Sequence, residues 1–475
     1  MTIELEYKVS KFLVSGRKGR TMIKLFRSDT PGFLTDLLDA AAEKGRALMG
    51  WHPTAGPVTA PDIAELSELL LSRRGEASGV ALAMALVEGY TNASTDERQA
   101  FLKLLAERFR PEEDALDRAY QSWKSGVPGA LEILQAASES RRQELFRRIN
   151  MAPGGTRALV EMRQDLLDIL RDNASLRGVN ADFHHLFSSW FNRGFLTLRQ
   201  IDWNTPASIL EKVIRYEAVH EIHNWDDLRN RLQPADRRCY AFFHPQLVDE
   251  PLIFVEVALT AEIPGAIAPL LDLDRRPIPA TDANTAVFYS ISNTQRGLAG
   301  VSFGNFLIKQ VVEQLKAELP QIQTFVTLSP VPGFAGWLKK LRAEGVDWPE
   351  GEEAFAILDT PGWHEDTEKA ARLSDLICPT AARYFLEAKD KSNRPVDAVA
   401  RFHLGNGARL QRLNPLGDLS VNGLRQSHGL MVNYLYAPDE IERNHELFVE
   451  RGTVAVSDAI RRSLTQNNTP LRKTI

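Results

Sequence analysis

The sequence predicts an α+β protein in which an all-α amino-terminal domain, residues 1–178, is followed by a mixed α/β domain, residues 179–475. Two observations carry this prediction. In the first part, apolar residues recur at helical spacing between turns that contain Gly and Pro. After about residue 180, short β-rich runs alternate with helical stretches, as they do in α/β and α+β domains. At ~100–200 residues per domain, the chain has room for two or three domains.

The amino-terminal domain is predicted to be a series of helices. Ser94 followed by Glu97 fits a capping box at the start of one helix, and Pro111 is suited to open the next. Each of these helices has an apolar face: Phe101, Leu104, Leu105 and Phe109 in the first, and Leu116, Ala119, Tyr120 and Trp123 in the second. Further helices are expected at 31–49, 62–73, 77–90, 128–149 and 157–172. Because this half contains almost no candidate chemistry, we interpret it as a packing or assembly domain.

The second domain is predicted from short runs of apolar, β-branched and aromatic residues. The expected strands are Cys239–Phe243, Leu252–Leu259, Val287–Ile291, Thr324–Leu328 and Ala398–Leu404. The main helices between them are expected at 298–318 and 366–388. A further apolar strand at 430–436 (LMVNYLY) carries the polar groups of Asn433, Tyr434 and Tyr436.

Charge and cysteine content exclude several classes of protein. The formal net charge is −5, from 57 basic and 62 acidic residues, without the clustered basic residues that nucleic-acid binding requires. No run approaches the ~20 apolar residues of a membrane span. Cys239 and Cys378 form neither a disulfide framework nor a CxxC metal motif. The first residues lack a signal or transit pattern, and the last (LRKTI) are not a peroxisomal signal. We therefore expect a cytoplasmic protein without nucleic-acid or membrane partners.

The strongest local feature is a strand, a glycine-bearing turn and the start of a long helix. The strand at 288–292 (FYSIS) leads into residues 293–300 (NTQRGLAG). Such a turn presents unpaired backbone N–H groups and the positive end of a helix dipole, where a phosphate or diphosphate binds well. The candidate binding residues are Arg296, Gly297, Leu298, Ala299 and Gly300, with Arg296 as a charged donor. The alternative is structural, because glycine is common at strand-to-helix turns.

Ser329 ends a predicted strand, and the two prolines that follow it in SPVPGF (329–334) fix the path of the chain. This position holds a hydroxyl group at a strand terminus, where α/β sites usually lie. Spacing alone favours the alternative that this serine caps a helix predicted at Gly336–Arg342. The GxSxG elbow is absent, which disfavours a standard hydrolase.

Several histidines are candidates for chemistry. His403 stands near the end of an apolar run, just before a glycine-rich turn, where it could donate a proton or polarise a carbonyl. A core histidine bound to backbone is the commoner outcome. His220 and His223 could share a metal ion, but HExxH is absent and no third ligand stands out, so we predict no metal site.

Long blocks of the second half resemble the malonyl-CoA decarboxylase family. They are HPQLVDEPLIFVEVALT (244–260), FYSISNTQRGLAGVSFGNFLIKQVV (288–312), VTLSPVPGF (326–334), RFHLGNGARLQRLN (401–414) and GLMVNYLY (429–436). The likeness spans nearly all of 185–440 and is more diffuse in the helical half. Long ungapped blocks in a fixed order are more specific than any single motif.

This resemblance implies a helical domain used in oligomerisation, as a homotetramer, followed by a GNAT-like catalytic domain. It also implies binding of a coenzyme A thioester without a metal, biotin or pyridoxal cofactor. The family's catalytic serine falls on Ser329, its catalytic histidine on His403 and its active-site tyrosine on Tyr436. Animal members carry a glutamate, tied to the histidine's environment, where this chain has Ser302. The turn at 293–300 is similar to the diphosphate turn of GNAT-type acetyltransferases, although Thr294 stands where these have arginine or glutamine.

The implied reaction converts malonyl-CoA to acetyl-CoA and carbon dioxide. Cleavage of the C–C bond sends two electrons into the thioester carbonyl, so the enzyme must stabilise an enolate and then protonate carbon. A preorganised donor at a developing oxyanion contributes ~3–4 kcal/mol. We expect residues 296–300 to hold the diphosphate, His403 with a backbone N–H or Tyr436 to stabilise the enolate, and Ser329 to donate the proton. The roles of Ser329 and His403 could be exchanged.

Other functions fit parts of the same pattern. A GNAT-type acyl-CoA N-acyltransferase would share the phosphate-binding turn but would need an acceptor amine and a base. A non-catalytic acyl-CoA-binding scaffold would bind without turnover. A serine hydrolase would release free malonate and coenzyme A.

Overall fold

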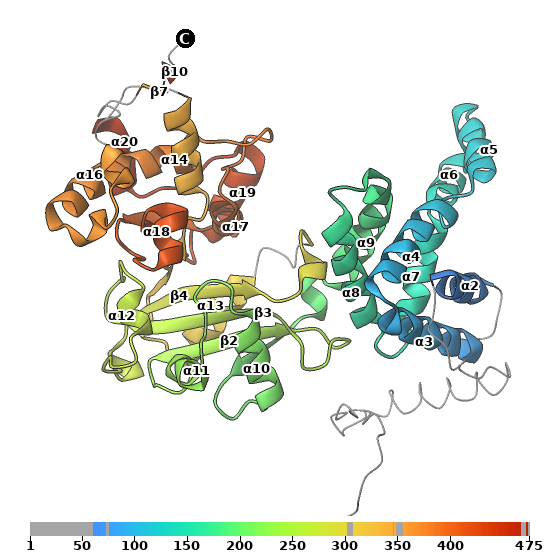
Figure 1. The fold of residues 1–475 in the computed structure, drawn as a ribbon, viewed down its shortest axis with the longest axis horizontal. Coiled ribbons are helices and arrows are strands. Elements are labelled where there is room, and N and C mark those ends of the chain that lie inside the picture. The colour runs from blue at the N-terminus through green and yellow to red at the C-terminus, as the bar shows by residue number, and fades with distance from the viewer. Residues whose placement is uncertain are drawn as a thin grey trace, which may run out of the picture.

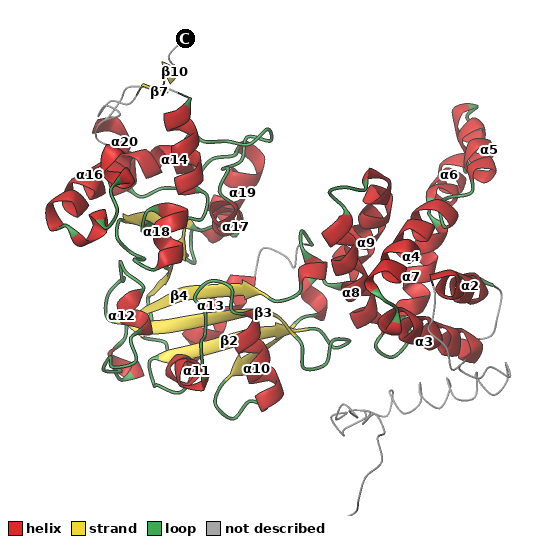
Figure 2. Cartoon of the chain, viewed as in Figure 1, coloured by secondary structure: helices red, strands yellow, loops and turns green. Residues whose placement is uncertain are grey.

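A computed structural model describes residues 60–72, 76–301, 307–344, 346–347, 355–466 and 472–473. The helix predicted at 31–49, and Ser302, lie outside these residues. The described chain forms a helical part, a sheet with helices on both faces, and a further group of helices beside the sheet (Figures 1 and 2). The predicted organisation, a helical part followed by a mixed α/β part, is therefore confirmed.

The helical part contains α2 (Ala60–Leu71), α3 (Glu76–Asn92), α4 (Thr95–Arg108), α5 (Glu113–Lys124), α6 (Ala130–Ser138), α7 (Arg141–Asn150), α8 (Gly155–Ile169) and α9 (Arg177–Trp190). The capping box at the start of α4 is confirmed: the Glu97 N–H donates to Ser94 Oγ, and the Ser94 N–H donates to Glu97 Oε2. The predicted apolar face of this helix is packed inside, with Phe101 and Leu105 fully buried. Local sequence signals thus account for this helix.

The single helix predicted at 128–149 is wrong. The chain breaks between α6 and α7, where the backbone of Glu139 and Ser140 is extended. The Ser140 hydroxyl donates to Asp182 of α9 at 2.8 Å, a tertiary contact that helical spacing does not report. The domain boundary near residue 178 stays a prediction. In the structure α9 crosses that position, and the first strand begins at Thr197.

The main sheet has eight strands among the described residues: β1 (Thr197–Ile201), β2 (Arg237–Phe243), β3 (Pro251–Thr260), β4 (Thr285–Asn293), β5 (Thr324–Thr327), β6 (Ser329–Pro330), β8 (Arg409–Asn414) and β9 (Met431–Leu435). They follow the order β1-β2-β3-β4-β5-β9-β6, with β8 also paired to β9. The pair β4–β5 is parallel and the other pairs are antiparallel. A separate small ladder joins β7 (Val346–Asp347) to β10 (Arg472–Lys473). The strands predicted between 239 and 328 are confirmed.

The parallel strands β4 and β5 direct two candidate segments to the same end of the sheet, the end at which both strands have their carboxyl termini. Residues 285–288 of β4 pair with 324–327 of β5, and the rest of β4 pairs with β3 alone among the described residues. Tyr289 is an extra residue in β4, because Glu256 faces Ser290 whereas Val257 faces Phe288. A bulge of this kind bends its strand and is common beside functional sites. The carboxyl ends of β4 and β5 lead into the glycine turn and to Ser329, respectively.

Helices cover both faces of the sheet. The first four are α10 (Ala207–Tyr216), α11 (Trp225–Leu232), α12 (Ala268–Leu271) and α13 (Leu307–Glu318). Alternate side chains of β3 pack in different clusters: Val255 and Val257 lie in the main core with α13, and Phe254 lies with residues of α10 and α11. Helix α13 therefore lies on one face of the sheet, and helices α10 and α11 lie on the other. Among the described residues, no helix combines the length and apolar character that crossing a bilayer needs.

The remaining helices form a group beside the sheet (upper left in Figure 1). They are α14 (Phe334–Ala343), α16 (Thr367–Leu386), α17 (Ala398–Gly405), α18 (Val421–Ser427), α19 (Ile441–Arg451) and α20 (Asp458–Gln466). The strand predicted at Ala398–Leu404 is wrong, because this segment is helix α17. Its start is fixed by Asp397, whose carboxylate accepts the N–H of Ala400 at 2.8 Å. The helix expected from residue 298 does not start there, since Arg296–Leu298 form one 3-10 turn and the backbone of Ala299 is not helical.

Candidate active site

Ser329, His403 and Tyr436 come together in one buried chain of hydrogen bonds. Ser329 begins β6, His403 lies on α17 and Tyr436 directly follows β9. Nε2 of His403 lies 3.2 Å from Ser329 Oγ, and Nδ1 lies 2.8 Å from the Tyr436 hydroxyl. All three side chains are at most 5% exposed. We call these three residues the histidine cluster.

Strand β9 holds the cluster at both ends. Its residue Val432 pairs with Ser329, and the N–H of Tyr436 donates to the carbonyl of Phe325 at 2.8 Å. The ring of Tyr434 stacks on the His403 imidazole, with 4.6 Å between ring centroids. Packing against this strand therefore fixes the orientation of the imidazole.

Thr327 is a member of the site that sequence reasoning missed. The Ser329 hydroxyl donates to Thr327 Oγ1 at 2.9 Å, and the N–H of Tyr434 donates to the same oxygen at 3.1 Å. With the serine proton directed to Thr327, the consistent tautomer of His403 carries its proton on Nε2 and accepts from Tyr436 at Nδ1. The spacing Thr-x-Ser at a strand end was the only available signal, and it is a weak one.

The histidine cluster is neutral near pH 7. Burial lowers the pKa of His403 from 6.5 to about 3, because an imidazolium without water is costly. Burial also raises the pKa of Tyr436 well above its ordinary value. The site therefore presents neutral hydrogen-bond donors, and it excludes water from the groups that carry them.

The glycine turn lies against the helical part. Arg296, which is exposed, pairs with Asp168 of α8. A Cβ atom on Gly297 would lie 1.9 Å from the carbonyl oxygen of Val160, so only glycine fits there. Gly300 differs, since its φ is +78° and a Cβ atom would meet nothing within 4 Å. The turn thus has a closed side at Gly297 and an open side at Gly300.

Some of the backbone N–H groups that were predicted to bind a phosphate at this turn already donate hydrogen bonds within the turn. The N–H of Leu298 donates to Gln295, and that of Ala299 donates to Arg296. Within the described residues, no backbone carbonyl accepts the N–H of Gly300. Of the five predicted binding residues, Arg296 and Gly300 therefore combine an exposed position with a backbone N–H that no backbone carbonyl accepts among the described residues.

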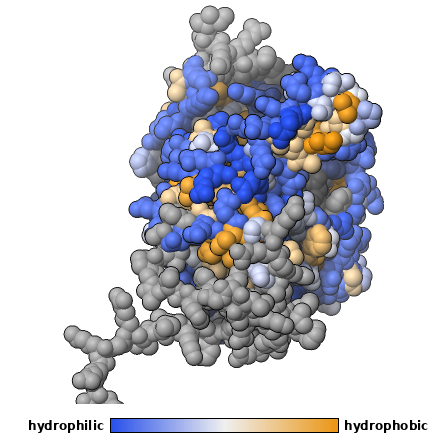
Figure 3. All heavy atoms as spheres, turned by 90° about the vertical axis from the view of Figure 1, so that its right-hand side faces the viewer, coloured by the Kyte–Doolittle hydropathy of each residue, from blue (hydrophilic) through white to orange (hydrophobic). Residues whose placement is uncertain are grey.

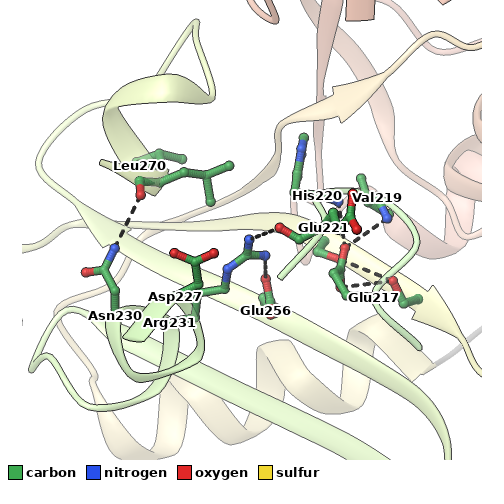
Figure 4. A network of polar contacts seen from close by, with 12 residues as sticks. Glu217, Val219, His220, Glu221, Asp227, Asn230, Arg231, Glu256 and Leu270 are labelled. Carbon is green, nitrogen blue, oxygen red and sulfur yellow. Dashed lines mark hydrogen bonds and ion pairs between the residues drawn. The ribbon is translucent and has the colours of Figure 1, made fainter. Parts of the chain in front are cut away.

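A second buried polar group lies on the α10–α11 face of the sheet (Figure 4). Arg231 Nη1 donates to Glu256 Oε2 at 3.0 Å, and Glu217 accepts from the Ser290 hydroxyl at 2.8 Å. We call Glu217, Arg231 and Glu256 the carboxylate cluster. Burial raises the pKa of Glu256 to about 7, although Arg231 opposes this shift. Sequence reasoning missed these residues, although a single acid within the apolar run PLIFVEVALT was a usable signal.

The two histidines considered for a metal site have different environments. His220 is buried near the carboxylate cluster, and its pKa falls to about 4 because of burial. His223 is exposed. Among the described residues, no group of three His, Cys, Asp or Glu side chains has a metal-binding arrangement.

Comparisons with family models and with known proteins all point to the same family. The malonyl-CoA decarboxylase C-terminal domain matches residues 194–474, and the N-terminal domain of the same family matches residues 109–191. The mitochondrial malonyl-CoA decarboxylase of Mus musculus is 35% identical over 368 residues, which cover 71% of this chain and 74% of the relative. That of Anser anser anser is 34% identical over 348 residues, covering 67% and 68%.

Solved structures agree in fold over most of the chain. The crystal structure of malonyl-CoA decarboxylase from Rhodopseudomonas palustris is 61% identical with a TM-score of 0.83, covering 86% of this chain and 100% of that one. The enzyme from Agrobacterium vitis is 56% identical with a TM-score of 0.81, covering 85% and 99%.

Proposed function

This chain belongs to the malonyl-CoA decarboxylase family, and we propose from that membership that it converts malonyl-CoA to acetyl-CoA and carbon dioxide. It is thus a carboxy-lyase. The observation that carries a mechanism is the buried hydrogen-bonded chain Ser329–His403–Tyr436. The glycine turn follows β4, the strand that pairs in parallel with β5, and Ser329 follows β5.

The reaction needs hydrogen-bond donors more than a base. The bond between the carboxylate carbon and C2 breaks, and its electron pair moves toward the thioester carbonyl to give an enolate. Carbon dioxide leaves, and C2 then takes one proton to become the acetyl methyl group. Each turnover therefore consumes one proton from solvent.

We assign the enolate oxygen to the Nε2–H of His403, which Tyr436 orients through Nδ1. The low pKa of His403 supports this role, because a neutral donor can bond a developing oxyanion without losing its proton. Ser329, 3.2 Å from Nε2, donates the proton to C2 and recovers one from His403 or water. Exchange of the serine and histidine roles is the competing assignment.

The diphosphate of coenzyme A is assigned to residues 296–300. The open space at Gly300 and its unused N–H support this assignment. Arg296 is exposed, so its guanidinium can exchange Asp168 for a phosphate. Binding energy from this remote group then holds the malonyl group at the histidine cluster.

The experiment is to incubate the protein with malonyl-CoA in D2O without an acceptor amine and to identify the products by mass spectrometry. We expect equal amounts of carbon dioxide and acetyl-CoA, with one deuterium in the methyl group. Free malonate and coenzyme A would indicate a hydrolase, and tight binding without turnover would indicate a scaffold. Transfer that requires an added amine would indicate an acyltransferase.

We also propose that the chain forms a homo-oligomer, a tetramer by resemblance to its family, through the outer end of the helical part. Helices α5 and α6 form the outer end of the helical part (Figure 1). The side of the molecule on which they lie is mostly hydrophilic but carries separate apolar patches (Figure 3). Five large apolar side chains of this hairpin are exposed, among them Trp123 at 47% and Ile133 at 57%; the others are Tyr120, Val127 and Leu131. Light scattering should give a smaller mass for Trp123→Ser/Ile133→Ser than for the wild type, and an unchanged mass would contradict this interface.

A cytoplasmic location is proposed as well. Cys239 and Cys378 are both free thiols, as expected in a reducing compartment. The animal relatives are named as mitochondrial proteins, so fractionation of cells that express the protein is the deciding measurement.

A further inference from the structure

Arg163 of α8 connects the helical part to the glycine turn. Its Nη1 donates to the carbonyl of Gly297 at 2.7 Å and its Nη2 to that of Ala299 at 2.9 Å. Its Nε donates to Asn180 Oδ1 at 3.1 Å. The residue is 2% exposed, and its contact with the Gly297 carbonyl is buried. One arginine therefore holds two consecutive corners of the turn in a fixed fork.

The charge of Arg163 has no counterion among the described residues, because all three acceptors are neutral. Burial alone lowers the pKa of its guanidinium, with no carboxylate contributing to the shift. A buried cation normally has an acidic partner, since leaving it unpaired costs several kcal/mol. The positive charge of Arg163 therefore lacks a counterion unless an anion binds nearby.

The contact with Ala299 also aims a backbone donor. In a trans peptide the C=O of Ala299 and the N–H of Gly300 point in opposite directions. Because Arg163 draws the Ala299 carbonyl toward α8, the Gly300 N–H points away from the helical part. A Cβ atom on Gly300 would meet nothing within 4 Å, and the next carbonyl, that of Gly300, lies 3.1 Å from Nε2 of His184.

We infer that Arg163 is a positioning residue for the substrate: it fixes the glycine turn from the helical part and supplies the positive charge that the coenzyme A diphosphate neutralises. This inference rests on the proposed binding of coenzyme A at residues 296–300. It gives the helical part a direct function in substrate binding in addition to assembly.

The test distinguishes an effect on binding of the nucleotide end of the substrate from an effect on the reacting malonyl end. Arg163→Gln should weaken coenzyme A binding, measured by calorimetry, by ~10-fold or more and raise KM for malonyl-CoA to a similar degree. With malonyl-pantetheine, which lacks the diphosphate, kcat/KM should stay within ~2-fold of the wild-type value. Arg163→Lys keeps the charge without the fork and should be intermediate. Arg157→Gln, on the same helix but exposed and paired with Glu250, is the matched control and should bind like the wild type.

Two outcomes overturn the inference. One is wild-type affinity of Arg163→Gln for coenzyme A, and the other is an equal loss with both thioesters, which indicates general damage to the fold. If Arg163→Gln does not fold, the same two comparisons on Arg163→Lys decide the question. Failure of the wild type to release carbon dioxide would refute the proposed function instead, and the calorimetric comparison of coenzyme A binding would still decide the role of Arg163.

Discussion

The histidine cluster and the carboxylate cluster are both withdrawn from solvent, but they lie on opposite faces of the sheet and hold different charge. Ser329, His403 and Tyr436 form a neutral chain, whereas Glu217, Arg231 and Glu256 bring ionisable acids around a guanidinium. Groups of both clusters have strongly shifted pKa values. A shifted pKa marks candidates for function, but structural ion pairs shift pKa values too.

The difference lies in what each cluster can do when new charge appears. A neutral donor chain at a strand end can receive an oxyanion, because its hydrogen bonds are already aimed and need no counterion. The carboxylate cluster would repel that same charge. Its contacts instead tie α11 and the segment around Glu217 to β3 and β4, and we interpret it as structural.

The largest expected effect comes from breaking the buried ion pair. Arg231→Met leaves Glu256 buried without its partner and should lower the free energy of unfolding at pH 8 by about 3–5 kcal/mol. Urea titration measures this loss. Arg231→Met/Glu256→Leu removes both charges and should recover most of the stability. A loss below ~1 kcal/mol in the single variant would mean that the pair contributes little to the fold.

The histidine cluster should give the opposite pattern, a large loss of rate. Ser329→Ala and His403→Ala should each lower kcat for malonyl-CoA at least ~100-fold, equivalent to about 2.7 kcal/mol, while calorimetry shows unchanged coenzyme A binding. Glu256→Gln, an equally buried change on the other face, is the matched control and should keep kcat within ~5-fold. Comparable losses in all three variants would remove the distinction between the clusters.

Local and nonlocal signals explain what the sequence could predict. The Ser94–Glu97 capping box and the strands of β2 to β5 depend on neighbours in the chain, and both were found correctly. The break between α6 and α7 depends on Asp182, some forty residues away, and was missed.

The candidate site follows the same rule. Ser329 and His403 are 74 residues apart, so spacing alone left each with a structural alternative, and only the family resemblance joined them. His403 was expected at a strand end and lies on a helix, because Asp397 caps α17 in a short segment whose apolar pattern suits either element. Arg163 and Glu256 have their partners in distant segments, as Thr327 has in Tyr434, and no local sequence pattern predicts such contacts.

The two clusters should also respond to pH with opposite signs. His403 has a folded pKa of about 3 against 6.5 unfolded, so the unfolded state binds more protons and stability rises with pH between these values. Glu256 has a folded pKa of about 7 against 4.5, so its contribution is largest at low pH and is lost as pH rises. Between pH 7 and 5 each effect amounts to about 2 kcal/mol.

Denaturant titrations at pH 5, 6 and 7 can separate the two contributions. On acidification from pH 7 to 5, His403→Gln should gain about 2 kcal/mol relative to the wild type, and Glu256→Gln should lose about the same amount. Parallel curves for the wild type and His403→Gln would mean that the imidazole is not held neutral by burial.

The smallest expected effect concerns the hydroxyl group of Tyr434, beside the histidine cluster, to which no residue of either cluster is hydrogen-bonded. The Tyr434 hydroxyl is fully buried without a hydrogen-bond partner among the described residues, although its ring stacks on His403. Tyr434→Phe keeps the stack and removes the unpaired hydroxyl, so it should raise the free energy of unfolding by about 1 kcal/mol and change kcat little. Tyr436→Phe, two residues along the same chain, removes a bonded hydroxyl and should lower both stability and kcat. A loss of stability in Tyr434→Phe would mean that this hydroxyl makes a hydrogen bond in solution and would contradict the prediction.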